Sequence, residues 1–132
     1  MAAAREAAAR PVDLPLARPR RQHLSENAHE LFRAPDNEVQ LSAASAMEIA
    51  TKTRLGRLVL PKPAWDFVGE ARTQHRIAAR PMDEESALHV ARLPDHRRDP
   101  FDRLLVAQAI VHGLVLLTPD ALVRQYPART MW

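Results

Sequence analysis

One stretch of the sequence limits the possible folds more than any other. Residues 97–120 read RRDPFDRLLVAQAIVHGLVLLTPD, which predicts a helix over 100–112, a stop at Gly113 and the apolar strand LVLLT. A short, wholly apolar strand that follows a helix is typical of a parallel sheet covered by helices on both faces. The segment therefore predicts an α/β fold.

The segments on either side of this stretch repeat the alternation of helix and strand. Before this stretch they predict a helix in HLSENAHELFRAP, a strand in NEVQLSAAS and a helix ending at Gly56. A helix from Pro63 to about Arg76 with Trp65 on its packed face, a strand in RIAARP and a helix capped by Asp83 follow. After the stretch, a short helix near 120–125 and an edge strand in ARTMW are predicted. This order predicts one small parallel sheet flanked by helices.

The amino-terminal 22 residues have a different character. Ala/Arg repeats are followed by Pro11, Pro15 and Pro19, whose spacing of four forbids a continuous helix or a central strand. We therefore expect residues 1–22 to be a disordered arm and residues 23–132 to form the domain. Asp13 lies in this arm, and no apolar strand leads into it.

Composition narrows the class of protein. The net charge of +3 belongs to the arm, because residues 23–132 hold fourteen basic and fourteen acidic groups, so composition supports a nucleic-acid partner only weakly. The absence of cysteine excludes disulfides and thiolate metal sites and favours a reducing cytoplasm. Only three glycines leave no phosphate-binding loop, and no apolar run is long enough for a membrane span.

Each acid at the joints between strands and helices has a simple structural explanation. Asp99 fits a helix N-cap with Asp102 at the third helical position, Asp120 follows the cap residue Thr118, and Ser45 with Glu48 reads as a capping box. Such roles stabilise a helix by about 0.5–2 kcal/mol.

The joint arrangement of these acids indicates a second possibility. Glu48 and Asp120 both follow apolar strands, and the carboxyl ends of parallel strands meet at one edge of the sheet, where ligand sites form. Asp102 reaches that edge if its helix starts there. Crowded carboxylates repel unless a hard cation joins them, and Mg²⁺ or Mn²⁺ there would activate water for attack on a phosphodiester.

Two blocks of the sequence resemble a known family. NEVQLSAASAMEIATKTRLGRLVLP and LPDHRRDPFDRLLVAQAIVHGLVLLTPD are similar to the PIN-domain family, specifically to the VapC-type toxins of toxin–antitoxin pairs, and the resemblance runs from about residue 24 to the carboxyl terminus. It implies a three-layer α/β fold with a small parallel sheet. It also implies a homodimeric ribonuclease that uses Mg²⁺ or Mn²⁺ to cut RNA and is inhibited by a cognate antitoxin.

The resemblance also implies the site residues. Glu48 matches the acid in the helix after the second strand, Asp102 the acid opening the long central helix, and Asp120 the acid after the following strand. These three are the implied catalytic residues and metal ligands. Asp99 matches an extra aspartate and is either an auxiliary metal ligand or the helix cap.

One part of the family pattern is missing from this sequence. Members begin with an apolar strand that ends in an aspartate, whereas this chain begins AREAAARPVDLPLARPRRQ, so we expect the first strand to be absent. The resulting hypothesis is a metal-dependent endoribonuclease toxin with impaired activity. The alternative is a non-catalytic remnant of the fold that binds an antitoxin without cleaving RNA.

Overall fold

A computed structural model describes residues 5–9, 30, 37–96, 98–118 and 120–132. Its five strands are β1 (Arg5–Ala9), β2 (Asn37–Ser42), β3 (Ala78–Arg80), β4 (Val115–Leu117) and β5 (Thr130–Met131), and they form one sheet in the order β3-β2-β1-β4-β5. Every neighbouring pair is parallel. The parallel α/β architecture expected from the sequence is confirmed.

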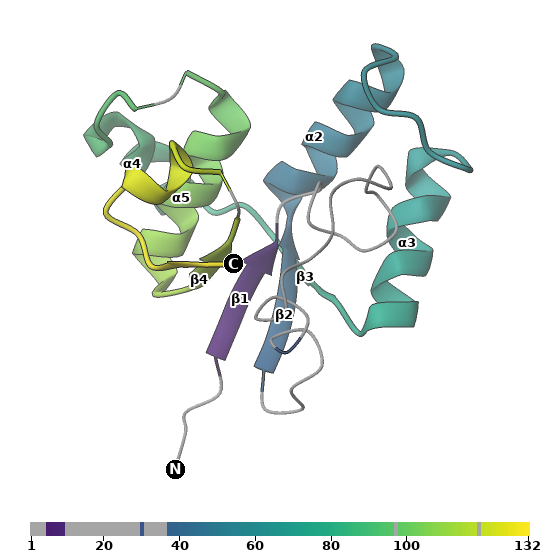
Figure 1. The fold of residues 1–132 in the computed structure, drawn as a ribbon, viewed down its shortest axis with the longest axis horizontal. Helices are drawn as coiled ribbons and strands as arrows, with labels where there is room; N and C mark the ends of the chain where they lie inside the picture. Colours follow the sequence, from purple (N-terminus) through teal and green to yellow (C-terminus); the bar gives the residue numbers. More distant parts are fainter. Residues whose placement is uncertain (1–4, 10–29, 31–36, 97, 119) are drawn as a thin grey trace.

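Helices cover the sheet on two sides. The helices are α2 (Ala43–Arg54), α3 (Ala64–His75), α4 (Glu84–His89) and α5 (Pro100–His112), with 3-10 turns η2 (Val90–Arg92) and η3 (Val123–Gln125). In Figure 1, α2 and α3 lie on one side of strands β1 and β2, and α4 and α5 lie on the other. None of the described helices is both long enough and apolar enough to cross a bilayer.

Each side of the sheet has its own apolar core. The α5 side is built from α5, β4 and the chain after it, and includes Leu105, Leu116 and Tyr126. The other side is formed by β2, α2 and α3 around Leu41, Ile49 and Phe67. Burial of these side chains fixes the two helical layers against the strands.

The expectation that the first strand is absent is wrong. Strand β1 occupies the middle of the sheet, where Ala9 pairs with Leu41 of β2 and with Leu117 of β4. The sequence REAAA has low intrinsic strand propensity, so its conformation depends on pairing along both edges, which closes the space between β2 and β4. Residues 5–9 thus belong to the sheet and not to a disordered arm.

Other predictions for the amino-terminal region are not tested. Asp13 and the other arm residues beyond β1 lie outside the described residues, as does the helix predicted in HLSENAHELFRAP apart from residue 30. Disorder of the arm beyond β1 stays a prediction.

The start of α2 corrects a second prediction. Ser42 is the N-cap, since its Oγ accepts the backbone N–H of Ala44 at 3.1 Å. The helix therefore begins three residues earlier than a capping box of Ser45 and Glu48 requires, and both residues lie inside it. Glu48 in the second turn cannot reach the cap position, so the capping explanation fails for this acid.

Helix α3 shows a third difference. Trp65, expected on the packed face, is 91% exposed, whereas Phe67 and Ala71 are buried. Because positions 67 and 71 are four residues apart and both face the core, position 65 lies on a different face of the helix. Trp65 is therefore available to contact something other than the core of its own domain.

Candidate functional site

The topology brings the starts of two helices to the same edge of the sheet. Strand β2 runs directly into α2 at Ser42, so the first turns of α2 lie at the carboxyl edge. Helix α5 enters β4 through a turn at Gly113, whose φ of 67° suits glycine. The amino-terminal end of α5 must therefore lie at the carboxyl edge as well, and α2 contacts α5.

Glu48 is a fully buried acid on α2. Its Oε2 accepts a hydrogen bond from Lys52 Nζ at 2.6 Å, and together they form an ion pair. Its Oε1 is buried and has no hydrogen-bond partner among the described residues. Buried carboxylate oxygens are normally satisfied, so this oxygen is placed to accept a ligand or a water.

Asp102 is the second buried acid, 1% exposed in the first turn of α5. The cap of this helix is a different residue, because Asp99 Oδ1 accepts the backbone N–H groups of Phe101 at 2.9 Å and Asp102 at 3.3 Å. The prediction that Asp99 caps this helix is confirmed. Capping thus does not explain why the Asp102 side chain is buried, although the positive end of the helix dipole favours a carboxylate there.

Asp120 has a structural role of its own. Its Oδ1 accepts the backbone N–H groups of Leu122 at 2.9 Å and Val123 at 3.3 Å, and its own N–H is accepted by Thr118 Oγ1 at 3.1 Å. Asp120 therefore caps the turn after β4 in addition to lying just beyond the carboxyl end of that strand.

The donor chemistry at this edge suits a hard divalent cation. Mg²⁺ is commonly bound by one or two carboxylates and several waters, and Glu48 offers a buried oxygen without a partner among the described residues. Within the described ranges, however, no three or more His, Cys, Asp or Glu side chains come together as a metal-binding group. Metal ligation by Glu48, Asp99, Asp102 and Asp120 stays a prediction, and the two buried acids are its best-placed members.

The reading of the sequence missed Lys52. Glu48 and Lys52 are four residues apart on one helix, a spacing at which a glutamate and a lysine regularly pair. This spacing is visible in the sequence. It normally indicates an exposed ion pair on a helix surface, and only the burial of Glu48 in the structure shows that this pair is different.

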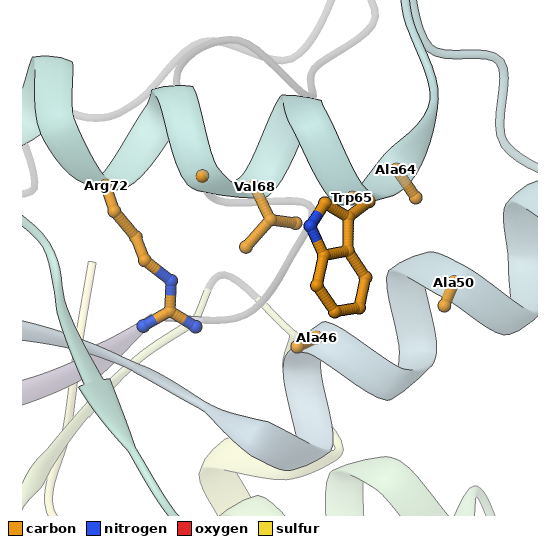
Figure 2. Close-up of a pocket in the computed structure, with 7 residues that line it drawn as sticks. Ala46, Ala50, Ala64, Trp65, Val68 and Arg72 are labelled. Carbon is orange, nitrogen blue, oxygen red and sulfur yellow. The ribbon is translucent and has the colours of Figure 1, made fainter.

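A surface pocket of about 410 Å³ lies between α2 and α3. Figure 2 shows Val68, Trp65 and Arg72 extending from α3 toward α2, where Ala46 and Ala50 form the opposite wall. Arg72 Nη1 is buried without a hydrogen-bond partner among the described residues. The pocket is therefore mainly apolar with one cationic group, unlike the carboxylate edge.

Comparison with known proteins identifies the family and a solved structure with a similar fold. A family model described as "PIN domain" matches residues 16–128. The crystal structure of FitAcB from Neisseria gonorrhoeae is similar to this chain with a TM-score of 0.55 and 20% sequence identity, and the match covers 96% of each chain. At this identity the likeness shows the fold alone. No curated protein matches the chain.

Proposed function

Because the chain belongs to the PIN-domain family, we propose that it is an endoribonuclease toxin of a toxin–antitoxin pair, dependent on Mg²⁺ or Mn²⁺ and of low activity. The observation that carries the proposal is the burial of two acids, Glu48 and Asp102, on contacting helices that both start at the carboxyl edge of the sheet. The resemblance to VapC-type toxins suggests RNA as substrate, an antitoxin as partner and the cytoplasm as location.

The four acids would take two different roles around such a cation. Glu48 and Asp102 would hold it directly, and Asp99 and Asp120, whose Oδ1 atoms cap helical turns, would act through its waters. When bound, the cation supplies an activated water and charge neutralisation for phosphodiester hydrolysis. The carboxylates would determine where the cation binds.

Two features support low activity. Strand β1 ends at Ala9 and is followed in the sequence by Arg10, whereas the VapC-type toxins that the sequence resembles have an aspartate after their first strand. In addition, the Glu48 carboxylate is paired with Lys52. A smaller negative charge at the site weakens attraction for a divalent cation.

Cleavage of a mixed RNA pool by the purified full chain tests the proposal. Activity should require Mg²⁺ or Mn²⁺, disappear with EDTA, and fall on the order of a hundredfold in Asp102→Asn, which keeps the shape and removes the charge. Asp66→Asn changes an exposed acid on α3, is the matched control and should cleave like the wild type. Robust cleavage that withstands both EDTA and Asp102→Asn would refute the carboxylate mechanism.

A second function is favoured by the surface of α2 and α3. Large apolar side chains are exposed on these helices and in the connection between them. Trp65 of α3 is 91% and Met47 of α2 is 62% exposed, and Val59 and Leu55, which follow α2, are 89% and 60% exposed. Where such side chains form one continuous patch, exposed apolar surface marks contacts with other proteins. The alternative is therefore a non-catalytic PIN domain that binds an antitoxin, or a second copy of itself, without cleaving RNA.

The binding alternative has its own test. In a Trp132→Phe background, Trp65 is the only tryptophan, and its fluorescence should shift to shorter wavelength when the protein encoded by the adjacent gene is added. Sedimentation of the chain alone, compared with Trp65→Ser, separates self-association from antitoxin binding. Binding together with no metal-dependent cleavage would favour the alternative over the ribonuclease.

A further inference from the structure

A lysine already neutralises the fully buried acid of the candidate site. Lys52 Nζ lies 2.6 Å from Glu48 Oε2, and the Lys52 side chain is 33% exposed whereas that of Glu48 is 0% exposed. The hydrogen bond is short, as expected when both partners are charged. Glu48 thus has a resident cation that comes from its own helix.

Burial makes this pairing necessary. An ionised carboxylate removed from water is strongly unfavourable unless a cation or several hydrogen bonds compensate it. Lys52 compensates one oxygen of Glu48, and Oε1 has no hydrogen-bond partner among the described residues. One cation is therefore in place, and one oxygen is left to accept another ligand.

We propose that Lys52 competes with the divalent cation for Glu48. Its ammonium holds the carboxylate in the metal-free protein, and tight metal binding requires it to turn away toward solvent. The proposal rests on the metal site proposed above and adds a residue that sets the affinity of that site.

The geometry of Lys52 allows such a movement. Its long, flexible side chain is partly exposed, so the ammonium can be rehydrated by rotation about side-chain bonds while α2 stays intact. The net charge of the Glu48–Lys52 pair is zero, whereas Glu48 alone contributes −1 to the site. Removing the lysine charge should therefore strengthen metal binding, and keeping it should keep binding weak.

Mn²⁺ binding to the full chain, followed by the electron paramagnetic resonance of the free ion, tests the proposal. Lys52→Met should bind Mn²⁺ about fivefold more tightly than the wild type, the upper end of the change expected for loss of one partly exposed ion pair. Lys52→Arg should stay as weak as the wild type. Lys62→Met removes a lysine whose partner, Glu70, is on the exposed surface, and should have no effect.

Thermal unfolding provides a readout that does not depend on catalysis. In EDTA, Lys52→Met should unfold at a lower temperature than the wild type because Glu48 loses its compensating charge. Added Mn²⁺ should raise its midpoint by more than that of the wild type. The double variant Glu48→Gln/Lys52→Met should show neither effect. If Lys52→Met does not fold, Lys52→Gln replaces it, since its neutral amide can still donate to Glu48.

The outcomes separate this proposal from the proposed function. Equal Mn²⁺ affinities in the wild type and Lys52→Met would overturn competition by Lys52 and leave the metal site standing. Absence of Mn²⁺ binding in every variant would overturn both. If Lys52→Met still tightens Mn²⁺ binding when Glu48→Gln is also present, Lys52 acts on another ligand, and the proposal is overturned.

Discussion

Asp99 Oδ1 accepts the backbone N–H of Asp102 at 3.3 Å, so the partly exposed Asp99 caps the helix that carries the buried Asp102. The two acids are three residues apart and have different roles. Asp99 satisfies the otherwise unpaired N–H groups of the first turn, whereas Asp102 is placed by that turn at the carboxyl edge.

Substitutions at these two positions should separate stability from activity. Asp99→Ala should lower the free energy of unfolding by about 1 kcal/mol, as loss of an N-cap does, and Asp99→Ser should largely restore it. Asp102→Asn should leave stability almost unchanged and lower metal-dependent cleavage on the order of a hundredfold. Urea unfolding and RNA cleavage of the three variants measure both quantities. A large loss of stability in Asp102→Asn would mean that its carboxylate mainly supports the fold.

A surface pair far from the site along α5 predicts a pH dependence. His112 Nε2 lies 2.8 Å from Asp83 Oδ1, and this contact, with hydrogen bonds from Ser86, lowers the pKa of the Asp83 carboxyl well below its ordinary value of 3.8. A carboxyl group whose pKa is lower in the folded than in the unfolded protein stabilises the fold when the pH is above its ordinary pKa. This contribution is lost as the pH falls from that value toward the pKa of the folded state.

Urea unfolding between pH 5 and pH 2 measures this contribution. The wild type should lose more stability over this range than Asp83→Asn, whose amide keeps an oxygen for the cap but does not titrate. The difference should be small because both side chains are about one third exposed. Identical pH profiles for the two proteins would show that the pair contributes nothing.

Strand β1 gives a prediction about the amino terminus. Because it is paired along both edges, the backbone N–H groups of residues 6–9 should exchange slowly with deuterium. Ala7→Pro should remove that protection and destabilise the domain, since proline cannot donate in a central strand. Ala3→Pro, before the strand, is the control. Rapid exchange of residues 6–9 in the wild type would contradict a central β1.

The sequence predicted the elements that carry strong local signals. Helix α5 has an aspartate cap, a proline in its first turn and a glycine at its end, and all three are observed in these positions. Strand β1 carries no such signal, because REAAA favours a strand only through its neighbours on both sides. The start of α2 was misplaced because Ser42 and Ser45 are both good caps, and only the strand before them decides between the two.

The candidate site was only partly predictable. The order of strands and helices places Glu48, Asp102 and Asp120 toward one edge, but sequence patterns cannot tell a buried acid from a cap. Burial of Glu48 and Asp102, and capping by Asp99 and Asp120, come from the folded geometry.

The most direct test of a metal site at this edge is a crystal structure of the protein grown with Mn²⁺, using anomalous scattering to locate the ion. We expect an anomalous peak bound by the carboxylates of Glu48 and Asp102, directly or through one water, with Lys52 Nζ turned away from Glu48. A map without a peak between α2 and α5 at saturating Mn²⁺, with the Lys52–Glu48 pair intact, would contradict it.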